Sequence, residues 1–91
     1  MYLNIGSDMA VRDKSIIGIF DMDKATVSKR TRMFLEAKQQ ENKVINAATD
    51  IPKSFIVCNW GMDVVVYISQ ISSKTLLKRA QEEGAWLSMG E

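Results

Sequence analysis

The sequence predicts an α+β domain in which a mostly antiparallel sheet of about five strands is covered by one long helix and a C-terminal helix. Two observations predict this class. Short apolar or alternating runs bounded by Gly, Asp or Asn recur along the chain, which is typical of strands. Two other segments repeat apolar residues every three or four positions, which is typical of helices. The order β-β-β-α-β-β-β-α, with short links between strands, favours antiparallel pairing with helix on one face of the sheet.

Six segments are candidate strands: Tyr2–Ile5, Met9–Arg12, Ser15–Phe20, Lys43–Asn46, Lys53–Cys58 and Asp63–Ser69. The third is rich in β-branched and aromatic residues, so we expect it to be buried, and Gly18 within it permits a close backbone approach. A four-residue hairpin loop, 59–62, is expected between the last two strands, with Gly61 at a turn position. Residues 47–52 are expected to form a loop because Pro52 lacks an N–H donor.

The long helix is expected to begin with Asp23 or Thr26 as its N-cap and to run to about Glu41. Asn42 is a suitable stop because asparagine tolerates the left-handed backbone conformation. The helical repeat predicts a sheet-facing side, which Met33 can widen, made of Val27, Thr31, Phe34 and Ala37 or Lys38.

A second helix is predicted from about Lys74 to Glu83, with Ser72 or Ser73 as its cap. The side expected to be buried comprises Leu76, Leu77 and Ala80. The chain has 91 residues, 46% of them apolar and 25% charged, which is the size and composition of one globular domain. We therefore expect a single domain over residues 1–84, followed by a tail over residues 85–91.

Location and catalysis are both constrained by what the chain lacks. A single cysteine rules out an intramolecular disulfide, no signal-peptide pattern begins the chain, and the longest apolar run, 64–68, is too short for a membrane span. A cytoplasmic protein without a membrane partner is expected. The absence of histidine removes the commonest general base and metal ligand, and no phosphate-binding glycine motif is present. An enzyme is therefore not expected, nor is a cofactor, a metal or a small-molecule ligand.

Two features were weighed as possible sites of chemistry. Cys58 lies inside an apolar run, which favours a small buried hydrophobe over a catalytic thiol. Asp21 and Asp23 could hold a cation such as Mg²⁺, but carboxylates beside a helix start more often cap the helix and interact with its dipole.

Basic residues concentrate in the middle of a chain whose net charge is only +1. Residues 24–53 carry seven basic and three acidic side chains, and four of the cations, Lys24, Lys29, Arg30 and Arg32, crowd the start of the long helix. Such residues either contact nucleic-acid phosphates or form a solvated helix face. Five apolar residues have no evident place in the core and indicate either self-association or packing on the chain's own core: Trp60, Met62, Trp86, Leu87 and Met89.

Several segments recur in register in one known family: Tyr2–Gly6, Ser15–Asp21, Pro52–Val57, Tyr67–Ser69 and Ser73–Arg79. Together they resemble the bacterial extracellular matrix regulators, the RemB branch more closely than the RemA branch, over about residues 2–80. The resemblance implies a LytTR-like fold and a ring-shaped homo-oligomer that binds double-stranded DNA and regulates transcription of extracellular matrix (biofilm) genes.

In the RemA branch, basic residues on the outer surface of the ring contact DNA at two places. Lys14 matches the first, a basic position just before the third strand. The second is an arginine pair in the loop before the fifth strand; here the loop reads Thr-Asp-Ile-Pro-Lys, so only Lys53 keeps a positive charge. The resemblance implies that Lys14 and Lys53 hold phosphates, and the concentration of basic residues adds Arg12, Lys29 and Arg32 as helpers. The missing arginine pair leaves an alternative, an oligomeric scaffold or adaptor that binds proteins and has weak or no DNA affinity.

Overall fold

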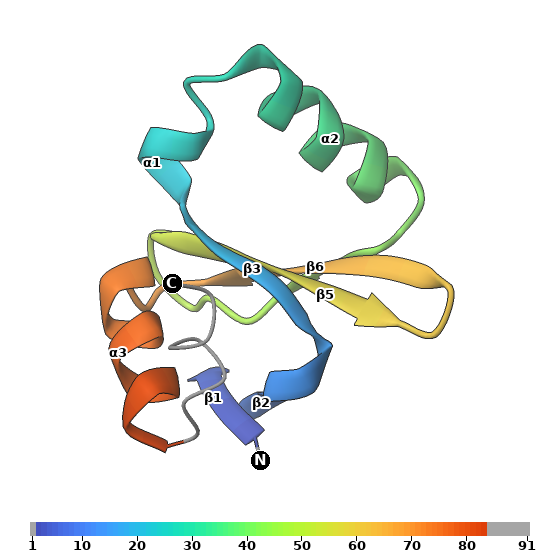
Figure 1. Cartoon of the computed structure of the whole chain (residues 1–91). Coiled ribbons are helices and arrows are strands. Elements are labelled where there is room, and N and C mark those ends of the chain that lie inside the picture. The colour runs from blue at the N-terminus through green and yellow to red at the C-terminus, as the bar shows by residue number, and fades with distance from the viewer. Residues whose placement is uncertain (1, 84–91) are drawn as a thin grey trace.

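The structure, a computed structural model, describes residues 2–83 and confirms the α+β class. The expected domain end at residue 84 and the tail 85–91 lie outside the described residues. In chain order the elements are β1 (Tyr2–Gly6), β2 (Met9–Arg12), the 3₁₀ turn η1 (Asp13–Ser15), β3 (Ile16–Asp21), α1 (Met22–Ala25), α2 (Lys29–Gln40), β4 (Val44–Asn46), β5 (Ser54–Trp60), β6 (Asp63–Ser69) and α3 (Ser73–Glu83) (Figure 1).

The strands form two sheets rather than the one mostly antiparallel sheet of about five strands that the sequence predicts. β1 and β2 make an antiparallel hairpin, and the other four strands form a mixed sheet in the order β3-β5-β6-β4, with β4 parallel to β6. The hairpin separates from the sheet because its apolar side, which includes Leu3, Ile5 and Val11, packs onto the sheet's face. The LytTR-like topology implied by the resemblance stays a prediction.

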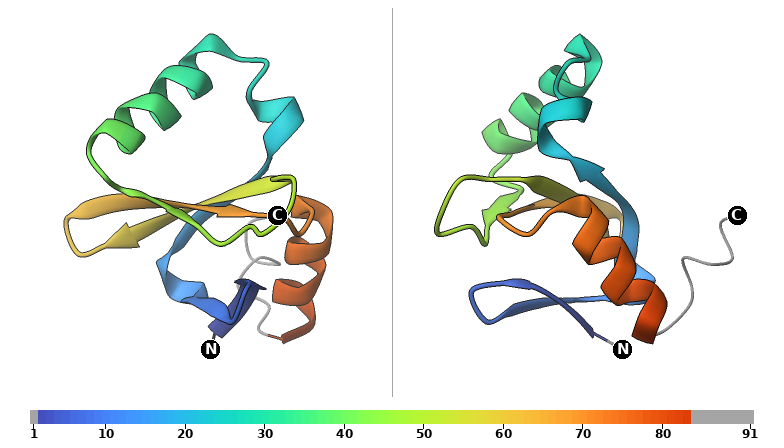
Figure 2. Two further views of the ribbon diagram at one scale, coloured as in Figure 1. Left: turned by 180° about the vertical axis from the view of Figure 1, so that it is seen from behind. Right: turned by 90° about the vertical axis from the view of Figure 1, so that its left-hand side faces the viewer.

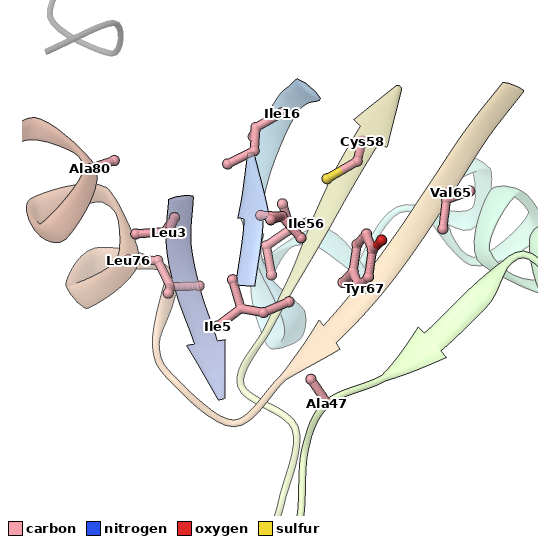
Figure 3. Packing of buried hydrophobic residues seen from close by; sticks show 11 residues of the cluster. Leu3, Ile5, Ile16, Ala47, Ile56, Cys58, Val65, Tyr67, Leu76 and Ala80 are labelled. Atoms are coloured by element: carbon pink, nitrogen blue, oxygen red, sulfur yellow. The ribbon is translucent and has the colours of Figure 1, made fainter. Parts of the chain in front are cut away.

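The four-stranded sheet is the middle of three layers (Figures 1 and 2). The β1–β2 hairpin and α3 cover one face, while α1 and α2 lie over the other. On the hairpin side the buried cluster joins the sheet to both covering elements (Figure 3): Leu3, Ile5, Val11, Ile16, Ala47, Ile56, Cys58, Val65, Tyr67, Leu76 and Ala80. On the α2 side a smaller cluster centres on Phe55, Val57 and Val66. The central strands are apolar on both faces because both faces are covered.

Two short helices replace the long one that was expected. The Asp21 carboxylate accepts a hydrogen bond from the Lys24 N–H (2.9 Å) and caps α1. The Ser28 hydroxyl accepts one from the Thr31 N–H (3.4 Å) and caps α2. Neither Asp23 nor Thr26 is therefore the N-cap. The Thr26 hydroxyl instead donates to the Met22 carbonyl (2.6 Å), at the point where α1 ends.

The side of α2 that packs on the sheet also differs from the prediction. Val27 precedes the helix and is 79% exposed, and Met33 is exposed as well. Phe34 and Leu35 are the α2 residues that pack against the smaller cluster, so Phe34 is the residue of the expected apolar side that makes this contact. The helix ends as predicted, because Asn42 follows the C-cap in the left-handed conformation (φ 61°).

The C-terminal helix agrees with the prediction, and so does its buried side except at Leu77, which is only partly buried. The Ser72 hydroxyl accepts a hydrogen bond from the Thr75 N–H (3.2 Å), so Ser72 caps α3, and Leu76 and Ala80 are fully buried. The β5–β6 hairpin is tighter than expected, since Trp60 pairs with Asp63 and leaves a two-residue turn. Its first residue, Gly61, has φ 61°, a conformation that glycine adopts without a steric cost.

β3 carries an irregularity that determines which side chains face each layer. The pairing with β5 shifts between Ile16 and Gly18, so Ile16 and Ile19 both pack toward the hairpin-side cluster although they are three residues apart. A Cβ on Gly18 would lie 2.7 Å from the ring of Phe20. Gly18 therefore makes room for a side chain rather than for the backbone, and Phe20 comes to lie on the α2 side.

Candidate nucleic-acid interface

Three of the five cations that the sequence suggests for phosphate contacts lie at the two ends of β3. Arg12 ends β2 and Lys14 lies in η1, just before β3 begins. Lys53 lies beside the end of β3: its N–H donates to the Ser69 carbonyl (2.8 Å), and its carbonyl accepts from the Met22 N–H (2.9 Å). Six residues at about 3.3 Å each place these two groups roughly 20 Å apart along the strand. The five residues therefore do not form one cluster within a single chain.

The other two cations lie on α2 and differ in what they contact. Lys29 is exposed in the first helical turn. Arg32 is exposed too, but its Nη1 donates to the carbonyls of Thr26 (2.6 Å) and Val27 (2.9 Å). This guanidinium holds the connection between α1 and α2, so part of its hydrogen-bonding capacity is used within the chain.

A third group of charges near the β5–β6 turn is already neutralised. The Lys43 ammonium contacts Asp63 (2.6 Å) and Glu41 (3.5 Å), and Lys38 also contacts Glu41 (3.4 Å). The hydrogen bond to Asp63 raises the pKa of Lys43 and lowers the pKa of Asp63. Within residues 2–82, no such ion pair engages Arg12, Lys14, Lys29 or Lys53, so their charges are available to a partner.

The loop before β5 is ordered by its own polar side chains. The Gln70 side-chain oxygen accepts hydrogen bonds from the Thr49 N–H (2.7 Å) and hydroxyl (2.8 Å). The Asp50 carboxylate accepts from the N–H of Ile51, whose side chain is exposed. An exposed carboxylate and an exposed isoleucine thus lie beside Lys53, at the place where the resemblance implies an arginine pair. This loop presents less positive charge than that pattern implies.

An apolar groove of about 340 Å³ opens between β3 and the α1–α2 layer, and sequence reasoning missed it. Ile17 (57% exposed) and Phe20 (42% exposed) lie along it, and the Phe20 ring stacks on Phe55 with ring centroids 5.2 Å apart. The other apolar side chains lining the groove are Ala25, Phe34 and Val57. Phe20 and Phe34 are the residues that could have indicated the groove, but the sequence pattern led us to expect both side chains in the core.

The structure shows what Cys58 and Asp21, the residues considered as possible sites of chemistry, contribute to the fold. Cys58 is fully buried, and desolvation raises the pKa of its thiol to about 11, so the thiol is protonated and packed as a core side chain. Asp21 acts as a helix cap, the alternative that the sequence favoured over a cation site. Residues 2–83 contain no group of three or more His, Cys, Asp or Glu side chains that could hold a metal ion. Among the described helices, none is both long and apolar enough to cross a membrane.

Comparison with known proteins agrees with the resemblance. Residues 2–80 match the family model described as RemA-like, extracellular matrix regulatory protein A-like. The chain is also 41% identical over 81 residues to extracellular matrix regulatory protein B of Bacillus subtilis (strain 168), an alignment that covers 89% of this chain and 91% of that protein. The chain therefore belongs to the RemA-like family of extracellular matrix regulatory proteins.

Proposed function

We propose that this chain is a transcriptional regulator that assembles into a ring-shaped homo-oligomer and binds double-stranded DNA through phosphate contacts. Membership of the RemA-like family and similarity to a protein named as an extracellular matrix regulator support the regulatory role. The observation that carries the DNA contact is the basic residues at both ends of β3, which make no ion pair within residues 2–82. Arg12 and Lys14 lie at one end and Lys53 at the other.

The spacing of these groups suits a nucleic-acid backbone. Roughly 20 Å along β3 corresponds to the rise of about six base pairs along the axis of a DNA duplex, at 3.4 Å per pair. Each chain then supplies two points of contact with phosphates, and the number of contacts increases with the number of subunits in the proposed ring. Repetition matters because the loop at Asp50 and Ile51 gives each subunit fewer phosphate contacts than an arginine pair would.

Self-association is supported by the groove and by the edges of the sheet. Exposed apolar side chains that line a groove commonly mark an interaction site. β3 is also an outer strand of the four-stranded sheet, with β5 as its one strand partner in the described structure. An unprotected edge beside an apolar groove is a surface that a second copy can cover.

The DNA contact is tested by fluorescence anisotropy with a labelled duplex at two salt concentrations. We expect affinity to fall with salt, and Lys14→Glu and Lys53→Glu to weaken binding equally for unrelated sequences. Removing one phosphate contact should lower the slope of log affinity against log salt by roughly 0.9. Lys78→Glu, which reverses an exposed cation on α3, is the matched control. An intact oligomer that does not bind duplex at low salt refutes the DNA role.

A protein scaffold is the second candidate, and the exposed tip of the β5–β6 hairpin favours it. Met62 is fully exposed there, and Trp60 beside it is more than half exposed. Such side chains are common in protein interfaces. Native mass measurement separates the possibilities: a ring that binds no duplex supports the scaffold, and a monomer at working concentration excludes the ring for both.

A further inference from the structure

Trp60 is exposed although it extends a buried row of side chains. It follows Cys58 by two residues on β5, so it lies on the same face of the sheet as Cys58 and, on β6, Tyr67. Figure 3 shows both of those side chains on the face toward β1. The ring centroids of Trp60 and Tyr67 are 6.5 Å apart, yet Trp60 is 55% exposed.

The strand register places Trp60 beside the basic end of β3. Ile16 of β3 pairs with Cys58 of β5. Beyond this pair β5 continues alongside η1, and the two elements are in contact. A recess of about 200 Å³ opens here, lined by Tyr2, Ala10, Val11, Arg12, Ser15, Cys58, Trp60 and Tyr67. Pockets for drug-sized ligands hold about 300–1,000 Å³, so this recess has room for little more than one planar ring system.

Charge around the recess is positive but modest. Arg12 pairs with Tyr2 across the hairpin and contributes a guanidinium, and Lys14 follows in η1. The nearby carboxylates are Asp13, beside both cations, and Asp63, which is paired with Lys43. Stacking on Trp60 is therefore the larger contribution to binding, and a single phosphate contact the smaller one.

We propose that this recess binds one nucleotide, with its base stacked on Trp60 and its phosphate held by Arg12. The ligand class is a planar base that carries a phosphate, either an unpaired nucleotide of a DNA strand or a free mononucleotide. This inference rests on the proposed DNA binding for the role of Arg12, whereas the stacking on Trp60 does not depend on duplex binding at Lys53. An exposed aromatic flanked by cations is the arrangement that binds unpaired bases without sequence preference.

Intrinsic fluorescence tests the proposal in the full-length chain. The Trp86→Phe variant leaves Trp60 as the only tryptophan, so its emission reports the recess alone. We expect saturable quenching by a short oligothymidylate, and the same titration with thymidine monophosphate identifies the source of the nucleotide. Equal affinity for the monophosphate supports a free nucleotide, while at least tenfold tighter binding of the oligomer supports a strand. No quenching by either ligand overturns the proposal.

Two substitutions check the assigned roles with a labelled oligothymidylate. Trp60→Ala should weaken binding about tenfold, and Trp60→Phe, which keeps a stacking ring, should recover most of it. Arg12→Gln should weaken binding and flatten its salt dependence while leaving the core unchanged. Unaltered affinity in both Trp60→Ala and Arg12→Gln overturns the assignment. Duplex binding measured on the same proteins separates the claims: duplex binding without Trp60 quenching refutes only the recess, and binding of neither ligand refutes both proposals.

Discussion

The hydroxyl of Ser69 joins three parts of the fold, although the side chain is fully buried. It donates to the carbonyl of Ile5 in β1 (2.7 Å) and accepts from the N–H of Ile71, just before α3 (3.0 Å). It thereby connects the end of β6 to the N-terminal hairpin and to the turn that leads into α3. Ser54 offers a matched comparison, because its buried hydroxyl makes a single hydrogen bond, to the carbonyl of Ile71 (2.7 Å).

Replacing Ser69 with alanine should be costly because it leaves the buried carbonyl of Ile5 and the partly buried N–H of Ile71 without this partner. An unsatisfied buried donor or acceptor costs about 1–3 kcal/mol, so Ser69→Ala is expected to lower the free energy of unfolding by about 2–4 kcal/mol. Ser54→Ala leaves one such group and should cost about 1–2 kcal/mol. Domains of this size lose about 4–8 °C in Tm per kcal/mol, so the difference between the variants should be measurable.

Urea unfolding followed by circular dichroism measures both effects. All proteins must be compared at one chain concentration, since association adds to the apparent stability. A Ser69→Ala variant that loses no more stability than Ser54→Ala refutes the reasoning. If the m-values are unchanged, the variants expose the same surface on unfolding, and the shift in the urea midpoint reports a change in the free energy of unfolding.

Three further outcomes are expected. Burial raises the pKa of Cys58 from 9.0 to about 11. The stability that the neutral thiol contributes is therefore complete below pH 9 and is lost as the pH rises through 11. Urea unfolding at pH 8 and pH 11 should show a larger decrease in the free energy of unfolding for the native chain than for Cys58→Ala. Asn42→Gly should stabilise the chain by about 0.5 kcal/mol and Asn42→Val destabilise it by about 1–2 kcal/mol, because residue 42 is left-handed; the reverse order in thermal unfolding would contradict this. Arg32→Ala should cost about 1 kcal/mol in urea unfolding, whereas Lys29→Ala, the control, should have little effect; equal losses would exclude the structural role of Arg32.

Local chemistry made several elements predictable. The bounds of β2 and β6 agree with the expected strands because turn-forming residues flank each run. Asn42 ends its helix through a conformation that few other residues tolerate. The helix starts were not predictable in the same way, because Asp21, Asp23, Thr26 and Ser28 are all competent caps within eight positions. Tertiary packing, rather than local preference, selects the two that are used.

Other features depend on the fold as a whole. The alternating pattern of β1 and β2 is the same whether the hairpin extends the sheet or folds over its face, so the division into two sheets could not be inferred. The turn position of Lys14 was predictable from its neighbours, whereas Lys53, expected to begin a strand, lies just before β5. The separation of the two residues along β3 depends on the β3–β5 register. The sequence likewise marked Trp60 as unplaced, while its position beside Arg12 follows only from the tertiary structure.

The unequal burial on the two faces of the sheet has a thermodynamic consequence. Among the described residues, α3 contributes two fully buried side chains, Leu76 and Ala80, whereas α2 contributes none. The α1–α2 layer should therefore open at a lower free energy than the rest of the domain and show faster amide hydrogen exchange. If a second copy covers the groove, as proposed, it would stabilise the layer that carries Lys29 and Arg32. The proposed assembly and DNA binding would then be linked equilibria, each strengthening the other by the same factor.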